Sequence, residues 1–540
     1  MTLGRTGRTA LLAIAMAGLL SLFAGLSLWE MLDDSLTSDE RVHLPAGYAY
    51  WMARDFRLNP EHPPLVKLLC AIPLLFMRVE MPPTTPDPGL SYHDYQPIFG
   101  SKFFFRQDAD RILFFGRLPA LVLGLALVVL MFAWSRELHG HAGAGLVTLG
   151  LAALEPTILA HSHYVTDDVG LACFSVMALY GLWRFTRGGR AWDLLIASAG
   201  TGLALATKYS AVVLLPVIFL LILVRWPAGG LRIGRRVWTG GSWRPRAAAL
   251  AGAALVMALI VQGAYLFSTD PSLYLRGSEA LRANRPEFNP AYVHGRFYGG
   301  MVLWYPLYAY LVKTPLPTLV VMAVAVVSCL RDRKRSREAL LFLLLPAGLY
   351  TLAICALAYN YGVRYLIPLT SLLLVLAGRW FFVHRERRAG RIASALLGPW
   401  LVLSILHASP YYISYFNELI GGPANGPYFL QDSNIDWGQD LKRLAFYLKR
   451  NDVPEVSLAF WGPGQPEYYG IRWKPWTLEA GWDPPPAGVY AISVNRLVEL
   501  KRRVMLGGEN PRLDWLDRFT PVAIAGSSIF VYRIPGAARP

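Results

Sequence analysis

The chain is poor in charged residues. Only 16% of its 540 residues are charged, whereas 54% are hydrophobic. The hydrophobic residues stand in long uninterrupted blocks rather than at helical or strand spacing, and no internal repeat or low-complexity linker separates them. This pattern excludes an ordinary soluble globular domain and indicates a polytopic α-helical membrane protein.

Cysteine is also scarce. The four cysteines lie in or beside apolar segments and none forms a CxxC pair, so we interpret them as small core residues without a disulfide or metal role. They are Cys70, Cys173, Cys329 and Cys355.

The net charge of +16 would suggest a nucleic-acid partner in a soluble protein. Here most basic residues stand in short loops between apolar runs, so a topological signal explains the charge better than an anionic partner does. We therefore expect no nucleic acid to bind.

Windows of about twenty apolar residues predict about eleven transmembrane helices. The first run, Ala10 to Leu28, is longer than a usual signal core and lacks a clear cleavage site, so we expect it to stay in the mature protein. The predicted spans lie near 8–31, 111–134, 143–160, 168–185, 191–207, 209–225, 247–267, 316–330, 339–358, 365–383 and 392–408.

The loops predict the orientation. With the N-terminus in the cytoplasm, every inner loop contains arginine, while the opposite loops hold most acids, histidines and prolines, as the positive-inside rule expects. The predicted inner loops are 136–141, 184–190, 225–246, 331–337 and 384–391.

Four outer features remain: a first outer loop at about 32–110, the segment 161–168, a later outer loop at about 268–315, and the tail after about 409. The tail differs in composition, with β-like runs and amphipathic helices. We expect a transmembrane domain over 1–408 and a small α/β extracytoplasmic domain over 409–540. The elements expected in the tail are a helix at 436–450, strands at 456–461, 489–494 and 522–532, and a helix at 496–502.

The first outer loop carries two acidic motifs beside the membrane. Asp39 and Glu40 follow the first apolar run, and their alternative interpretation is as helix caps. Glu61 and His62 precede a Pro-Pro pair, which fixes the chain and presents its neighbours at a defined place or simply stiffens the start of the next helix.

Further ionisable residues stand at predicted outer helix ends. Asp167 and Asp168 are either functional or ordinary solvated acids, Lys208 either contributes to a site or snorkels to the interface, and Arg364 either holds a lipid phosphate or anchors its helix. A carboxylate can take a proton from a nucleophile, and lysine or arginine can neutralise a phosphate leaving group. Such a set suits a reaction on a lipid-borne, anionic substrate.

Several motifs occur in the order seen in a known family. They are Asp39-Glu40 after the first span, Pro63-Pro64-Leu65-Val66-Lys67, Thr166-Asp167 after His161, Ala206-Thr207-Lys208-Tyr209, Lys313-Thr314-Pro315-Leu316 and Asn360-Tyr361-Gly362-Val363-Arg364. From about residue 8 to 408 the chain resembles the GT-C glycosyltransferases of the protein O-mannosyltransferase and aminoarabinose lipid A transferase type, glycosyltransferase family 39. The tail motifs 415–418 and 432–441 are similar to those of a bacterial subgroup.

This resemblance implies a GT-C fold in the bacterial inner membrane and inverting transfer of a hexose or pentose. The donor would be a polyprenyl-phosphate sugar and the acceptor an unidentified lipid, glycan or protein outside the cytoplasm, with membrane lipids as the other partners. The implied catalytic residues are Asp39, as the base, Glu40 and Asp167.

The same resemblance implies roles for other residues. Candidates to hold the donor phosphate are Lys67, Lys208, Arg296 and Arg364. Glu61, His62 and Asp168 would position the acceptor or the loop. No cofactor is required, but Glu61 and His294 would be the ligands of an optional divalent metal; lone histidines are more often structural. The chain has His62 where relatives have lysine, and a neutral histidine offers less charge to a phosphate.

A transporter or flippase for a lipid-linked sugar is the alternative function. Transporters usually show paired halves and helices broken near the membrane midplane. The sequence shows no such symmetry, and its ionisable groups gather at one face.

Overall fold

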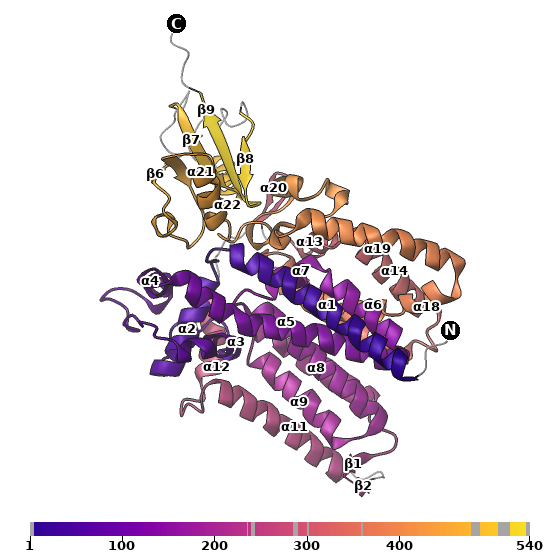
Figure 1. Ribbon diagram of the computed structural model, residues 1–540. Helices are drawn as coiled ribbons and strands as arrows, with labels where there is room; N and C mark the ends of the chain where they lie inside the picture. Colours follow the sequence, from indigo (N-terminus) through magenta and orange to yellow (C-terminus); the bar gives the residue numbers. More distant parts are fainter. Residues whose placement is uncertain are drawn as a thin grey trace.

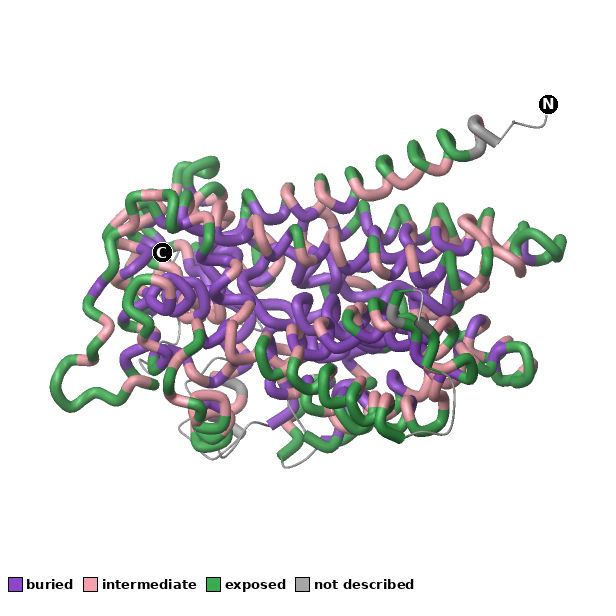
Figure 2. Tube along the Cα trace, turned by 90° about the horizontal axis from the view of Figure 1, so that it is seen from below, coloured by how far each residue is buried: buried purple, intermediate pink, exposed green. Residues whose placement is uncertain are grey.

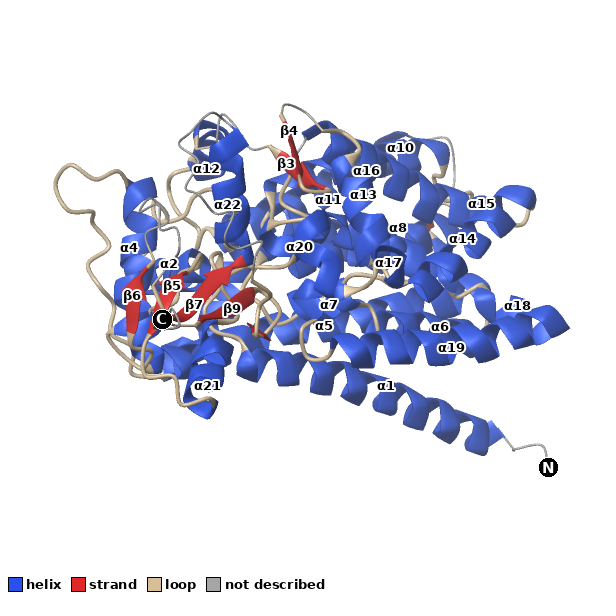
Figure 3. Cartoon of the chain, turned by 90° about the horizontal axis from the view of Figure 1, so that it is seen from above, coloured by secondary structure: helices blue, strands red, loops and turns tan. Residues whose placement is uncertain are grey.

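The computed structural model describes residues 5–234, 236–238, 243–284, 290–299, 302–357, 360–476, 486–505 and 519–535. Most of these residues are helical; two short hairpins, β1–β2 and β3–β4, lie between helices, and a five-stranded sheet forms near the C-terminus (Figure 1). The long helices run side by side in a bundle, with the sheet at one end and the N-terminus at the other (Figures 1 and 3). The predicted class, a polytopic helical protein with a small α/β part after the helices, is confirmed.

The helices have the following bounds. They are α1 (Arg5–Asp33), α2 (Glu40–Ala53), α3 (Leu65–Ala71), α4 (Tyr92–Phe105), α5 (Ala109–His139), α6 (Ala142–Ala153), α7 (Pro156–His161), α8 (Asp167–Gly188), α9 (Ala191–Leu205), α10 (Leu214–Val224), α11 (Trp243–Ala264), α12 (Leu273–Ala283), α13 (Tyr305–Lys313), α14 (Leu316–Arg331), α15 (Arg337–Ala339), α16 (Leu345–Leu357), α17 (Ile367–Ala377), α18 (Trp380–Glu386), α19 (Arg388–Ala408), α20 (Gly426–Phe429), α21 (Leu441–Arg450) and α22 (Val494–Met505).

Within the described residues, seven helices are long and apolar enough to cross a membrane. Helices α13 and α14, bent by 116° at their junction, would make an eighth if they form one span. The remaining predicted spans fall on shorter apolar helices at 142–153, 191–205 and 209–224. Each predicted span therefore coincides with an apolar helix, while the total of eleven crossings stays a prediction.

Burial separates central from peripheral helices. The apolar window of α8 is 83% buried, whereas that of α11 is only 6% buried. Figure 2 shows the buried residues gathered in the middle of the bundle and exposed ones along the outer part of α1. Apolar side chains that face outward on a long helix suit contact with lipid rather than water.

The first outer loop folds against one end of the bundle. It contains α2, α3 and α4, and Leu44, Val66 and Phe103 from these helices form a small core with Leu113 of α5. At Gly47 of α2 a Cβ would lie 2.1 Å from the carbonyl oxygen of Lys67, so only glycine permits this close approach of α2 to α3. The loop thereby becomes a fixed part of the fold.

A five-stranded sheet follows α19. Its order is β6-β5-β7-β9-β8, with β5 parallel to β6 and β7, and β9 antiparallel to β7 and β8. Leu441, Leu444 and Leu448 of α21 pack on the sheet. The strands of the molecule are β1 (Leu231–Ile233), β2 (Arg236–Trp238), β3 (Ala291–Val293), β4 (Arg296–Tyr298), β5 (Val456–Ala459), β6 (Trp473–Pro475), β7 (Gly488–Ser493), β8 (Ala523–Ala525) and β9 (Ile529–Ile534).

The helix predicted from Asp436 is wrong in its start, because the chain first turns at Gly438 (φ 89°) and α21 begins at Leu441. The single strand predicted over 522–532 is also wrong: the chain turns at Gly526 (φ 64°) and forms the two antiparallel strands β8 and β9. Strand β6 was not predicted because it is short and contains proline.

The two ends of the bundle carry different loops. Helices α15 and α18 and the β1–β2 hairpin lie away from the sheet, whereas α2, α4 and α12 lie on its side (Figures 1 and 3). The predicted inner and outer loops are thus separated as the charge pattern requires. Which end faces the cytoplasm stays a prediction.

Candidate active site

Asp39 stands immediately before α2 but does not cap it. The residue occupies the N-cap position without a side-chain capping hydrogen bond, and its Oδ2 lies 2.7 Å from Nη1 of Arg364. Burial would raise the pKa of Asp39, but Arg364 and His43 together outweigh it and hold the pKa below its usual value. The Asp39 side chain, 28% exposed, is therefore an accessible carboxylate.

Arg364 connects Asp39 to two further residues. Its Nη1 lies 3.4 Å from Oδ2 of Asp168, whose Oδ1 accepts a 2.6 Å bond from Nζ of Lys208. Arg364, Asp168 and Lys208 are buried, and they come from segments far apart in the sequence. We call Asp39, Asp168, Lys208 and Arg364 the Asp39 cluster. Because Lys208 is buried and paired, the snorkelling interpretation is not supported.

Aromatic rings line this cluster. The guanidinium carbon of Arg364 lies 4.4 Å from the ring centroid of Trp437, and Nζ of Lys208 lies 4.1 Å from that of Tyr365. Such cation–π contacts hold the charges in place without neutralising them.

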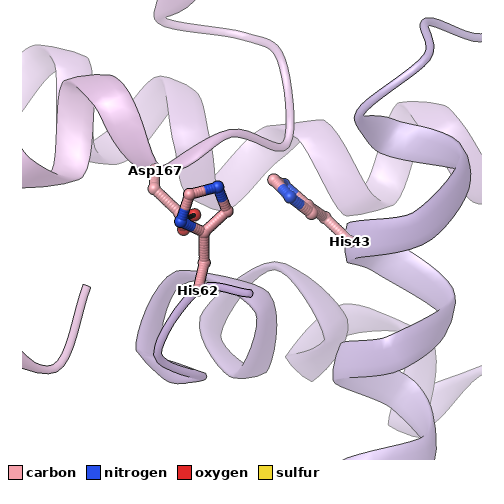
Figure 4. Close-up of side chains that lie close together, drawn as sticks. All are labelled: His43, His62 and Asp167. Carbon is pink, nitrogen blue, oxygen red and sulfur yellow. Dashed lines mark ion pairs between the residues drawn. The ribbon is translucent and has the colours of Figure 1, made fainter. Parts of the chain in front are cut away.

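Asp167, beside Asp168 in the first turn of α8, points elsewhere. It lies with His43 and His62, and Figure 4 shows the three side chains pointing toward one another. Burial, reinforced by Lys208, His43 and Lys67, holds the pKa of His62 well below its usual value, so this imidazole is neutral.

Glu40 has its carboxylate fully engaged. It forms a two-pronged ion pair with Arg117, both N–O distances being 2.7 Å, and accepts bonds from Thr37 and the Val165 amide. Arg117 also donates to the carbonyls of Met31, Asp34 and Ser35. We call Glu40 and Arg117 with these partners the Glu40 network; it ties α5 to the end of α1 and the start of α2.

A second buried network lies nearby. Asp34 is 2.7 Å from Arg443 of α21 and 3.2 Å from His163, and it accepts a short bond from Tyr164. Burial would raise the pKa of Asp34, but Arg443, His163 and Arg117 outweigh it and lower the pKa to about 2. This network attaches the tail to the bundle beside the Asp39 cluster.

Lys67 and Glu61 hold the loop together. Nζ of Lys67 donates to the carbonyls of Asn59 (2.6 Å) and His62 (2.8 Å), and burial lowers its pKa to about 8. Glu61 accepts bonds from His93 (3.0 Å), Asn284 (2.9 Å) and Gln96. Both side chains thus have protein partners of their own.

Arg296 and His294 stand apart. Both are exposed on the β3–β4 hairpin, and within the described part of the chain neither contacts the Asp39 cluster. His294 Nε2 pairs with the hydroxyl of Tyr308 (2.7 Å), while Glu61 is held by other side chains. The metal pair of Glu61 and His294 therefore does not fit this arrangement, in which the two residues do not meet.

Some of the site residues that sequence reasoning missed come from the tail. Asn434 accepts a bond from the Val363 amide (3.0 Å), its carbonyl accepts from Lys313 (2.5 Å), and the Trp437 carbonyl accepts from the Ser38 amide (3.1 Å). The polar stretch 432–440, interrupted by a tryptophan, is the signal that could have identified this contact.

Comparison with protein families gives a match to one part of the chain. The family model described as dolichyl-phosphate-mannose-protein mannosyltransferase matches residues 111–232, about a fifth of the chain, including Asp167, Asp168 and Lys208. No curated protein matches the sequence.

Among solved structures, the chain is similar to ArnT from Cupriavidus metallidurans bound to undecaprenyl phosphate, with 14% identity, TM-score 0.47 and coverage of 99% of this chain and 100% of the other. It is also similar to the Archaeoglobus fulgidus oligosaccharyltransferase in the apo form (11% identity, TM-score 0.45, coverage 85% and 64%). A third similarity is to the S. cerevisiae protein O-mannosyltransferase Pmt1-Pmt2 complex bound to the sugar donor (17% identity, TM-score 0.31, coverage 54% and 39%). The family match confirms the resemblance to membrane glycosyltransferases of the protein O-mannosyltransferase type over residues 111–232.

Proposed function

We propose that this protein is a membrane glycosyltransferase that moves a sugar from a polyprenyl-phosphate donor to an acceptor hydroxyl outside the cytoplasm. The observation that carries the proposal is the accessible Asp39 carboxylate, held by Arg364 at the end of the bundle instead of capping its helix. The match to a family described as acting on dolichyl-phosphate-mannose supports the donor class.

The chemistry follows from the two kinds of charge in the Asp39 cluster. Asp39 takes the proton of the acceptor hydroxyl as its oxygen attacks the anomeric carbon, and the bond from that carbon to the phosphate oxygen breaks. The polyprenyl phosphate leaves with the bonding electrons. A single displacement of this kind inverts the anomeric carbon.

Arg364 and Lys208 are suited to the leaving phosphate. Among the described residues, the buried Nε of Arg364 has no hydrogen-bond partner, so the guanidinium retains a donor for a phosphate oxygen. A phosphate that binds Arg364 would compete with Asp39 for this cation. Donor binding would therefore release the carboxylate to act as a base, while Asp168 keeps Lys208 in position.

A cavity that His62 helps to line suits a lipid-borne substrate. It has a volume of about 280 Å³ and is lined mostly by apolar groups, although Arg57 and Arg276 also line it. The apolar lining includes Tyr50, Phe56, Pro64, Tyr265 and Leu273. An isoprenoid chain would be accepted by such walls. Arg57 and Arg276 pair with Asp55 and Asp270, so an anionic headgroup would compete with these carboxylates for the arginines.

The remaining predicted residues take supporting roles in this proposal. Glu40 is saturated by Arg117, and Lys67 and Glu61 bind the loop itself, so they position the site rather than touch the reacting atoms. In this proposal, the part of the site that faces outward sets the specificity for the acceptor (lipid, glycan or protein) and for a hexose or a pentose.

The test is the variant Asp39→Asn in purified full-length protein reconstituted in lipid vesicles with radiolabelled polyprenyl-phosphate sugar. Loss of a general base costs about 10²- to 10⁴-fold in rate, so we expect transfer to fall by that factor. The matched control is Asp33→Asn, because Asp33 is an exposed carboxylate at the end of α1. This variant should retain activity.

Undiminished transfer by Asp39→Asn would remove this residue from the mechanism. Movement of the labelled donor across the vesicle membrane, without transfer to any acceptor, would instead favour the transporter interpretation.

A further inference from the structure

Three potential metal ligands converge on one point next to the Asp39 cluster. His43 comes from α2, His62 from the loop before α3, and Asp167 from the first turn of α8, as Figure 4 shows. One ligand atom from each residue lies within 4.8 Å of the other two. Segments that are far apart in the sequence thus bring two imidazoles and one carboxylate together.

The carboxylate of Asp167 has no hydrogen-bond partner among the described residues. The residue is 2% exposed, and neither oxygen accepts a hydrogen bond from another described residue. The buried Nδ1 of His62 is also unpartnered and lies 3.9 Å from Oδ2 of Asp167. Burial of a carboxylate without a partner is costly, so this geometry calls for a ligand that accepts electron pairs from both groups.

His43 is already oriented for such a ligand. Its Nδ1 lies 3.0 Å from the carbonyl oxygen of Val165. If Nδ1 carries the proton and donates it to this carbonyl, the lone pair is on Nε2. A histidine that binds a metal typically donates its other ring N–H to a carbonyl or carboxylate in this way.

The lysines nearby make no ion pair or hydrogen bond with Asp167 among the described residues. Nζ of Lys208 lies 2.6 Å from Asp168, the adjacent carboxylate, and Nζ of Lys67 donates to two backbone carbonyls. Two other carboxylates of this region have cationic partners: Asp39 pairs with Arg364, and Glu40 with Arg117. Asp167 is therefore the acid with capacity for an added cation.

We propose that His43, His62 and Asp167 form a binding site for a divalent transition-metal ion, for which zinc is the best-suited probe. Two imidazole nitrogens and one carboxylate oxygen suit zinc and disfavour calcium or magnesium, which prefer all-oxygen sites. Ligands of a tetrahedral zinc ion lie about 3.4 Å apart, so these side chains close slightly around the ion. Three protein ligands leave one position open to water or substrate.

This site differs from the pair implied by the family resemblance. Glu61 and His294 are held by different partners and do not meet, whereas His43, His62 and Asp167 do. The proposal does not depend on the transfer reaction, because metal binding is measured without donor or acceptor.

The experiment uses full-length protein in detergent, stripped with a chelator and then titrated with Zn²⁺. We expect one zinc per chain by elemental analysis, and a visible absorption band of low-symmetry Co²⁺ when cobalt replaces zinc. Asp167→Asn, His43→Gln and His62→Gln should each weaken zinc binding by more than the roughly 10- to 100-fold that loss of a supporting hydrogen bond costs.

Two histidine variants outside the site serve as controls. His93→Gln removes the histidine that contacts Glu61, and His294→Gln removes the one on the β3–β4 hairpin, and both should retain wild-type zinc affinity. The proposal is overturned if Asp167→Asn and His43→Gln bind zinc as the wild type does, or if His294→Gln alone abolishes binding.

A second measurement avoids any folding defect of the variants. In wild-type protein, bound zinc should protect the partly exposed His62 from diethyl pyrocarbonate, as read by mass spectrometry, while exposed His93 reacts equally with and without zinc. Equal modification of His62 in both states would contradict the site.

Discussion

Asp39 and Glu40 are adjacent in the chain but belong to two regions that use charge in opposite ways. Glu40 is fully buried, and its oxygens bind Arg117, Thr37 and a backbone amide. The Asp39 side chain is 28% exposed and has Arg364 as its ion-pair partner, whose Nε remains without a hydrogen bond in the described chain. The Glu40 network is closed, and the Asp39 cluster is open.

The difference indicates what each region does. A buried ion pair whose remaining hydrogen bonds are all satisfied fixes the geometry of the elements that carry it, even when its net contribution to stability is small. Unsatisfied buried polar groups, in contrast, are rare and gather where a ligand completes them. The closed network holds α1, α2 and α5 in fixed positions. The Asp39 carboxylate and the Nε of Arg364 in the open cluster therefore stay available to a substrate.

The largest expected effect comes from opening the closed network. Arg117→Met leaves Glu40 as a buried charge without its partner, so we expect the free energy of unfolding to fall by about 3–5 kcal/mol. The measurement is thermal unfolding in detergent together with the yield of folded protein. The double variant Glu40→Gln/Arg117→Met removes both charges and should lose less.

If the double variant were as unstable as Arg117→Met alone, the packing of Arg117 and not its charge would hold this region together.

A smaller effect is expected within the open cluster. Arg364→Lys keeps the positive charge. However, the lysine side chain is shorter and ends in a single ammonium group, which cannot contact both Asp39 and Asp168 as the planar guanidinium does. Loss of one charge-assisted hydrogen bond is worth about 1.5–3 kcal/mol, so we expect transfer to fall roughly 10- to 100-fold with little change in stability. The assay is the vesicle transfer reaction proposed for Asp39→Asn.

Arg296→Lys is the matched control for this variant, since Arg296 is exposed on β4 and touches no member of the cluster within the described residues. It should transfer at nearly the wild-type rate. Similar losses in both variants would mean that the open cluster is not where Arg364 acts.

Much of the helical architecture could be predicted from the sequence, because a membrane-spanning helix needs a long run of apolar residues that is visible in the composition. Long apolar runs give the positions of the helices directly, and α8 and α19 fall close to their predicted bounds. Strand β7 was also predictable from alternating and β-branched residues, whereas the single strand predicted over 522–532 is the hairpin of β8 and β9.

The partners of individual charges could not be predicted. Successive residues on a helix point about 100° apart, so Asp167 turns toward His62 while Asp168 turns toward Lys208. The adjacent pair Asp39-Glu40 divides in the same way. His43 was missed altogether, because a single histidine inside a helix carries no spacing signal, and Arg117 was missed because it stands within a span read only for hydropathy.

The boundary between the two regions is where the smallest effect should appear. Trp437, from the tail, stacks on Arg364 and also contacts His161 and Tyr164 at their ring edges. Trp437→Phe keeps an aromatic face but weakens the cation–π contact, which is worth about 0.5–1 kcal/mol beyond packing. We therefore expect a two- to fivefold loss of transfer, seen mainly in kcat/KM for the donor. Trp400→Phe, on the exposed side of α19, is the matched control and should be neutral. If Trp437→Phe instead lost as much activity as Arg364→Lys, Trp437 would have to act within the open cluster itself and not only pack against Arg364.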